Sequence, residues 1–149
     1  MGSAETTRPS SRAAGLKGAS LGLAAGSTAE LIRRMERGLR YAALGKFAAN
    51  SGLRVSELAA VLGIPERTLA RRRVSGYLSP EESERLLRIS RLIEKAVELF
   101  GGDVVGAVRW LRTKKKYLEN QPPLEYAKTE LGAREVENLL GRLEHGVYS

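Results

Sequence analysis

The stretch 54–76, RVSELAAVLGIPERTLARRRVSG, decides how this sequence is interpreted. Its first part places Leu58 and Leu62 at helical spacing, and Gly63 follows, a residue that allows a tight turn. Pro65 then opens a second short helix, since proline suits the first turn of a helix. Two short helices joined by a glycine-containing turn are typical of a helix-turn-helix, a motif that places its second helix in the major groove of DNA.

Arginine side chains crowd the second of these helices. Arg67 and Arg71 point away from the inward-facing Leu69, and a guanidinium can donate two hydrogen bonds to O6 and N7 of guanine, so both are candidates for base contacts. Arg72 and Arg73 are expected to contact phosphates. The candidate DNA-binding residues are Arg67, Thr68, Arg71, Arg72 and Arg73. Alternatively, Arg72 lies along the edge of the core, because it takes a position where such helices often carry an apolar residue.

The positive charge of the chain is confined to its first half. The net charge is +8; residues 1–79 hold 13 basic and 5 acidic side chains, whereas residues 80–149 hold 12 of each. This asymmetry suggests that the first half meets a polyanion and the second half a different partner. The alternative is that the first half has only a solvated basic face and tail.

Helical periodicity predicts an all-α fold, with an N-terminal helix-turn-helix domain followed by a small helical domain. Ser27 or Thr28, Ser56 and Asp103 are expected to cap helices, while Ser79 and Glu82 form a capping box. The expected helices cover residues 29–38, 40–52, 56–62, 65–74, 80–100, 104–113, 124–129 and 132–146, with a loop at 114–123. The expected domains are a disordered segment at 1–28, the helix-turn-helix domain at 29–79 and the second domain at 80–149.

Composition excludes several classes of protein. The chain has no cysteine and a single histidine, His145, so disulfides, thiolate sites and histidine-rich metal sites are not expected. It also lacks a convincing catalytic constellation, and we expect neither an enzyme nor a bound cofactor. No apolar run approaches the roughly 20 residues that span a bilayer. We expect a cytoplasmic protein without a membrane partner.

Beyond these patterns, most of the chain resembles a known family. The specific segments are ELFG at 98–101, RWL at 109–111, PLE at 123–125, GAREVENLLGRLEHG at 132–146 and VYS at 147–149. In this order they resemble the C-terminal toxin-binding domain of the Xre/MbcA/ParS-type antitoxins. The stretch LAAVLGIPERTLARRR, residues 58–73, is similar to the Xre-like helix-turn-helix half of the same family. The chain departs from the family pattern between Lys114 and Gln121.

The resemblance implies one half of a type II toxin–antitoxin pair. Such antitoxins bind a RES-domain toxin that attacks NAD or a related nucleotide, repress their own operator DNA, and form a homodimer through the C-terminal domain. We hypothesise that the last helix and tail dock on the toxin, with Tyr148 and the Ser149 carboxylate in its NAD pocket. The candidate toxin-binding residues are Arg142, Glu144, His145, Val147, Tyr148 and Ser149.

Two other hypotheses remain open from the sequence. The chain could be a dimeric helix-turn-helix regulator without a toxin partner, its second half serving only dimerisation. It could also be a protein-interaction module whose basic half is incidental. The absence of a neighbouring gene for a RES-type protein would favour the regulator over the antitoxin. The absence of a sequence-dependent gel shift with upstream DNA would favour the interaction module.

Overall fold

The computed structural model describes residues 26–146, and within this range it is all-α, as predicted. Eight α-helices and one short 3₁₀ helix follow one another, and the described residues contain no strand. The prediction of disorder at 1–28 falls almost wholly outside the described residues. The helices are α2 (Thr28–Arg37), α3 (Tyr41–Ser51), α4 (Val55–Val61), α5 (Glu66–Ser75), α6 (Pro80–Leu99), α7 (Val104–Arg112), the 3₁₀ helix η3 (Lys116–Leu118), α8 (Pro123–Tyr126) and α9 (Glu130–Glu144).

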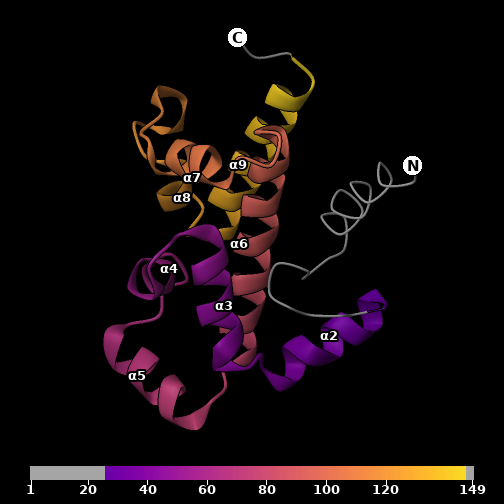
Figure 1. The fold of residues 1–149 in the computed structure, drawn as a ribbon, viewed down its shortest axis with the longest axis vertical. Coiled ribbons are helices and arrows are strands. Elements are labelled where there is room, and N and C mark those ends of the chain that lie inside the picture. The colour runs from indigo at the N-terminus through magenta and orange to yellow at the C-terminus, as the bar shows by residue number, and fades with distance from the viewer. Residues whose placement is uncertain (1–25, 147–149) are drawn as a thin grey trace, which may run out of the picture.

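The long helix α6 is the centre of the molecule. It packs against α2 on the helix-turn-helix side and against α7 and α9 on the C-terminal side (Figure 1). Its inward stripe includes Leu86, Ile89, Ile93 and Ala96, all of which are buried. These residues belong to one continuous apolar cluster that extends from α2 to α9. The two halves expected from the sequence therefore share α6 and a core.

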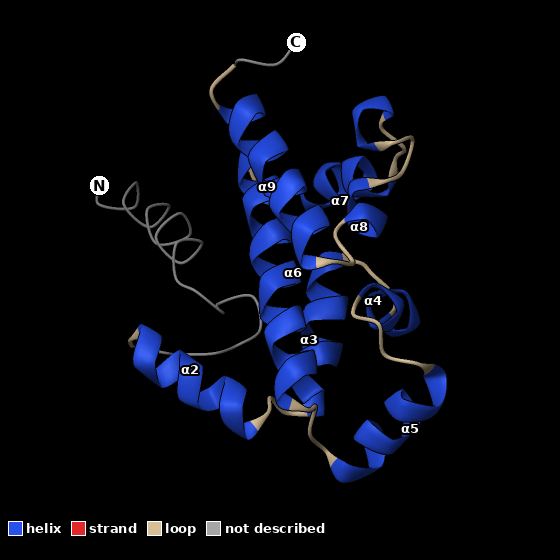
Figure 2. Cartoon of the chain, turned by 180° about the vertical axis from the view of Figure 1, so that it is seen from behind, coloured by secondary structure: helices blue, strands red, loops and turns tan. Residues whose placement is uncertain are grey.

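Figures 1 and 2 place α5 at one end of the long axis and the C-terminal end of α9 at the other. A surface built on α5 is thus far from a surface built around the end of α9. Two different macromolecules can contact these ends without competing for the same residues. The charge asymmetry of the sequence suggested two different partners, and this arrangement leaves room for both.

Most of the predicted helix caps are present. Ser27 accepts a hydrogen bond from the Glu30 N–H, and Asp103 accepts one from the Gly106 N–H. The capping box at the start of α6 is also formed: Ser79 Oγ accepts from Glu82 N–H at 3.1 Å, and Glu82 Oε1 accepts from Ser79 N–H at 2.8 Å. Caps were predictable because they depend only on residues within one helical turn.

Four local predictions were wrong, the first being the short helix expected at 124–129, which is α8 and ends at Tyr126. Ser56 does not cap α4, which begins at Val55 with Arg54 in the cap position and no side-chain hydrogen bond. The last helix begins two residues early, at Glu130, because Thr129 accepts the Gly132 N–H and so caps it.

The fourth error is the loop at 114–123. It contains the 3₁₀ turn η3, because Leu118 is buried and anchors the segment to the core. The Lys115 N–H also donates to the Gln121 carbonyl, which closes the segment into a compact turn. Lys115 Nζ lies 4.6 Å from the centre of the Trp110 ring. Burial lowers the pKa of this ammonium group.

One ion pair joins α4 to α7 across 55 residues of sequence. Arg112 donates from Nε and Nη2 to the two carboxylate oxygens of Glu57, at 2.9 and 2.7 Å. Hydrogen bonding from Arg112 lowers the pKa of the Glu57 carboxyl. The Arg112 side chain is 44% exposed, so water and salt weaken the attraction.

We therefore expect a small effect when this pair is broken. Arg112→Ala should lower the free energy of unfolding by less than about 1 kcal/mol, the usual range for an exposed pair. Urea unfolding at low and high salt measures it, and the loss should shrink as salt is added. A loss several times larger would mean that the pair is a principal tie between α4 and α7.

A candidate nucleic-acid interface and the C-terminal helix

The turn between α4 and α5 has the geometry that the sequence predicted. Gly63 adopts a left-handed conformation with φ of +72°, which a residue with a side chain rarely takes. The Ile64 N–H then donates to the Ala59 carbonyl at 2.9 Å, and both residues are buried. Leu69 is half-buried and packs against the same core. Ile64 and Leu69 thus hold one side of α5 on the protein.

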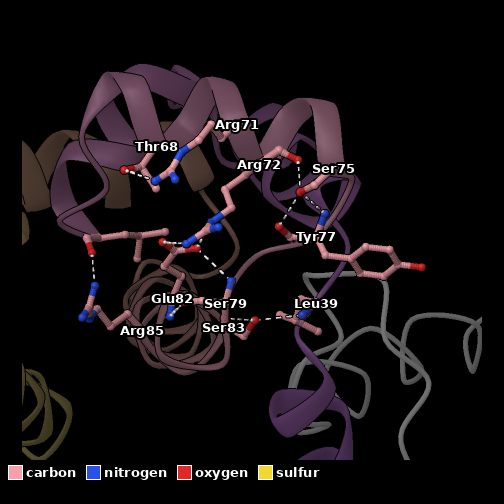
Figure 3. A network of polar contacts seen from close by, with 11 residues as sticks. Leu39, Thr68, Arg71, Arg72, Ser75, Tyr77, Ser79, Glu82, Ser83 and Arg85 are labelled. Carbon is pink, nitrogen blue, oxygen red and sulfur yellow. Dashed lines mark hydrogen bonds and ion pairs between the residues drawn. The ribbon is translucent and has the colours of Figure 1, made fainter.

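The rest of α5 faces solvent, and it contains no buried residue. Arg67, Arg71 and Arg73 are exposed, as the sequence predicted for DNA contacts. Thr68 is half-buried, and its Oγ1 accepts a hydrogen bond from Arg71 Nη2 at 3.2 Å (Figure 3). Val74 is 88% exposed, which leaves an apolar side chain at the end of the same basic helix. The helix therefore offers guanidinium groups and one apolar group to an outside partner.

Arg72 differs from its neighbours because its side chain is held by a carboxylate on another helix, α6. Its Nε and Nη2 donate to the two carboxylate oxygens of Glu82, at 2.8 and 3.0 Å (Figure 3). The Glu82 side chain is only 9% exposed and that of Arg72 27%. This two-pronged geometry is the strongest form of an arginine–carboxylate pair. The expected phosphate contact by Arg72 stays a prediction; the structure adds a role for Arg72 inside the chain.

Glu82 belongs to two structures at once, the ion pair with α5 and the cap of α6. Burial raises the pKa of its carboxyl, but hydrogen bonds from Arg72 and from the Ser79 N–H, with the charge of Arg72, outweigh burial and lower the pKa below its ordinary value. Glu82 is therefore ionised at neutral pH. The start of α6 and the orientation of α5 depend on the same carboxylate.

A second set of contacts fixes the end of α5. The Tyr41 N–H donates to the Gly76 carbonyl, and the Leu78 N–H donates to the Leu39 carbonyl, both at 2.8 Å. The Leu39 N–H donates to Ser83 Oγ on α6, also at 2.8 Å (Figure 3). Beside the start of α5, Arg85 on α6 donates to the Leu62 carbonyl at 2.9 Å. Hydrogen bonds to α6 therefore lie near both ends of α5.

At the opposite end of the molecule, a hollow of about 470 Å³ lies between α6 and α9. Two predicted toxin-binding residues, Arg142 and His145, line it together with Lys95 of α6. Glu144, a third predicted residue, is exposed and does not line the hollow. The remaining three, Val147, Tyr148 and Ser149, lie outside the described residues. The hollow thus brings together two of the predicted side chains and a lysine that sequence reasoning missed.

Comparison with known proteins matches both halves of the chain to domains of one antitoxin family. Residues 30–91 match the family model of the antitoxin Xre-like helix-turn-helix domain. Residues 95–146 match that of the antitoxin Xre/MbcA/ParS C-terminal toxin-binding domain. Antitoxin Xre of Yersinia enterocolitica serotype O:8 / biotype 1B is 39% identical over 130 residues, which cover 87% of this chain and 88% of that protein.

The chain belongs to the Xre antitoxin family. A second relative, antitoxin Xre of Photorhabdus laumondii subsp. laumondii, is 32% identical over 130 residues, again 87% of this chain and 88% of the relative. The family resemblance and the all-α fold predicted from the sequence are thereby confirmed. Proteins of this Xre family are antitoxins and are not known as enzymes.

No helix among the described residues is both long and apolar enough to cross a bilayer. In the same part of the chain, no three histidine, cysteine, aspartate or glutamate side chains gather where a metal ion could be held.

Sequence reasoning on this Xre-family chain missed the second role of Glu82. The capping box by itself accounts for a glutamate three residues after Ser79, so the pattern gives no reason to expect a second partner. A signal was present, since Arg72 stands where an apolar residue is usual in such helices. An arginine at an inward position requires a carboxylate or other acceptor nearby.

Proposed function

We propose that this chain neutralises a RES-domain toxin that degrades NAD, and that it represses its own operon by binding operator DNA through α5. The observation that carries the DNA half is α5 itself, an arginine-rich helix with no buried residue at one end of the molecule. The bond from Arg72 to Glu82 holds this helix, and the bond from Arg85 to the Leu62 carbonyl holds the turn before it. The proposal assigns the DNA-binding domain to residues 29–79 and the toxin-binding domain to residues 80–149.

A homodimer formed through the C-terminal domain would present two copies of α5. Closed two-fold symmetry relates the two helices, so the operator should be a palindrome with half-sites about one helical turn apart. Arg67 and Arg71 contact base edges, and Arg73 contacts a phosphate. The apolar Val74 suits the methyl group of thymine.

The toxin half of the proposal uses the end of α9 and the residues that follow it. Arg142 and His145 line the hollow beside this end, with Glu144 exposed on the same last turn. Val147, Tyr148 and Ser149 enter the toxin's NAD pocket, where the Tyr148 ring occupies the place of a substrate ring. Since α5 lies at the other end of the molecule, this docking leaves the DNA-binding helix uncovered.

Deleting residues 147–149 tests the toxin half. We expect toxin inhibition to weaken by at least about tenfold, because a few deeply inserted residues usually supply most of the binding energy of an interface. NAD consumption by the purified toxin with added antitoxin measures it. The matched control is a gel shift with operator DNA, which should be unchanged in the truncated chain.

Two results would contradict the proposal. Full inhibition by the truncated chain would show that the tail is not the inhibitory segment. If the chain binds operator DNA but does not bind a RES-domain protein, the result would instead favour a helix-turn-helix regulator without a toxin partner. Absence of any sequence-dependent gel shift would favour a protein-interaction module.

A further inference from the structure

A groove follows the junction of α6 and α9 and extends beyond the hollow at the end of α9. A second hollow of about 150 Å³ is lined by Arg88, Arg91 and Leu92 of α6 and by Ala133 and Arg134 of α9, with Glu130. Both hollows share Glu137 as a lining residue. We call the two together the α6–α9 groove.

The α6–α9 groove is more basic than the half of the chain that forms it. Five cationic side chains line it against two carboxylates, an excess of three positive charges. Residues 80–149 as a whole carry 12 basic and 12 acidic side chains, so this excess is offset elsewhere in the half. The cations are Arg88, Arg91, Lys95, Arg134 and Arg142, and the carboxylates are Glu130 and Glu137.

Arg88 differs from the other cations of this groove in having a buried nitrogen without a hydrogen-bond partner. Its Nε is buried, and among the described residues it is a side-chain donor without a hydrogen-bond partner. Buried donors in folded proteins nearly always have an acceptor, so an acceptor from outside requires the Arg88 side chain to shift toward the hollow that it lines. Neither carboxylate of the groove is that acceptor. Glu130 Oε2 lies 3.4 Å from Arg134 Nη2, and Arg88 Nε forms no hydrogen bond with Glu130 or Glu137.

We propose that the α6–α9 groove binds a carboxylate-rich segment of the toxin, and that a carboxylate of this segment accepts from Arg88. The inference rests on the proposed function, because it deepens the toxin-binding role of the C-terminal domain. A guanidinium matches a carboxylate with two parallel hydrogen bonds, which neither water nor an amide reproduces. The groove reaches Arg142 and His145, so one toxin surface can cover the groove while the tail enters the active site.

The test uses the full-length chain and the RES-domain toxin of the same operon in a catalytically inactive form. Calorimetry should show that Arg88→Ala raises the Kd for toxin about tenfold or more, since a desolvated charge pair loses one partner. Arg88→Lys should give an intermediate Kd, because it keeps the charge without the fork. Arg91→Ala should raise the Kd by a smaller factor, since Arg91 is exposed.

A readout on the free chain separates a binding role from a structural one. If Arg88 awaits a partner, Arg88→Ala should leave the urea midpoint of the free chain unchanged or raised, because it removes a buried donor without an acceptor. The matched control is Arg33→Ala, which removes an exposed cation of α2 and should leave the Kd for toxin unchanged.

Three results would overturn the inference. Wild-type affinity in both Arg88→Ala and Arg91→Ala would show that the groove does not contact toxin. A changed oligomeric mass with unchanged toxin affinity would assign the groove to an interface between two copies of the chain. If the wild-type chain itself fails to bind toxin, the proposed function fails together with this inference.

Discussion

Replacing Arg67 and Arg71 together by alanine is expected to abolish sequence-specific operator binding while leaving the fold intact. Both guanidiniums are exposed on α5 and neither supports the core. Each two-pronged contact of an arginine with guanine contributes about 1–3 kcal/mol, so the double variant should bind roughly 30- to 10⁴-fold more weakly. Fluorescence anisotropy with operator and scrambled DNA at fixed salt measures both the affinity and its sequence preference.

A charge-matched control makes this result interpretable. The double variant Arg33→Ala with Arg109→Ala also removes two positive charges, but from exposed positions on α2 and α7. We expect this control to lose little operator affinity and to keep its preference over scrambled DNA, since it removes only general electrostatic attraction. An equal loss in both double variants would show that α5 contributes charge alone and does not contact bases.

Glu82→Ala is expected to produce the largest loss of stability among single substitutions of charged residues near α5. It removes the carboxylate that holds Arg72 and that accepts the Ser79 N–H. The combined loss should be about 2–4 kcal/mol, less than for a fully buried pair because Arg72 keeps some contact with water. Operator binding should weaken as well, since α5 loses a contact that fixes its direction. Urea unfolding and anisotropy measure the two effects.

Two comparisons show which part of Glu82 matters. Glu82→Gln keeps an oxygen that can accept from Ser79 but loses the charge, so it should cost less stability than Glu82→Ala. Glu57→Ala breaks the more exposed pair with Arg112 and should cost less than about 1 kcal/mol. If Glu82→Ala costs no more than Glu57→Ala, the contact between α5 and α6 is not a principal support of the motif.

The lowered pKa of Glu82 also fixes the pH range of this contribution. A carboxyl whose pKa is lower in the folded chain stabilises the fold above its unfolded pKa and loses that contribution as pH falls through the folded value. The stability difference between wild type and Glu82→Gln should therefore stay constant from neutral pH to the ordinary value of 4.5, and shrink at more acid pH. A difference that already declines at neutral pH would contradict the ionised pair.

The sequence alone determined the helices, most of the caps, the turn at Gly63 and the exposed basic character of α5. These features depend on residues within a few positions of one another, through helical periodicity and hydrogen bonds inside a single turn. The errors had two origins, one local and one in the packing of the core. Thr129 competed with the expected start of α9, and the burial of Leu118 folded a segment whose lysines suggested a loop.

Only the tertiary structure decided which charged groups meet. Arg72 forms an ion pair with Glu82 on another helix, and Arg112 forms one with Glu57, 55 residues away in sequence. The α6–α9 groove combines side chains from two helices that are separated in sequence by α7 and α8. The reason is physical: the direction of a long side chain depends on which elements pack beside it, and packing is set by the whole core. The sequence therefore identified the basic helix, whereas the fold determined that Arg72 supports it from within.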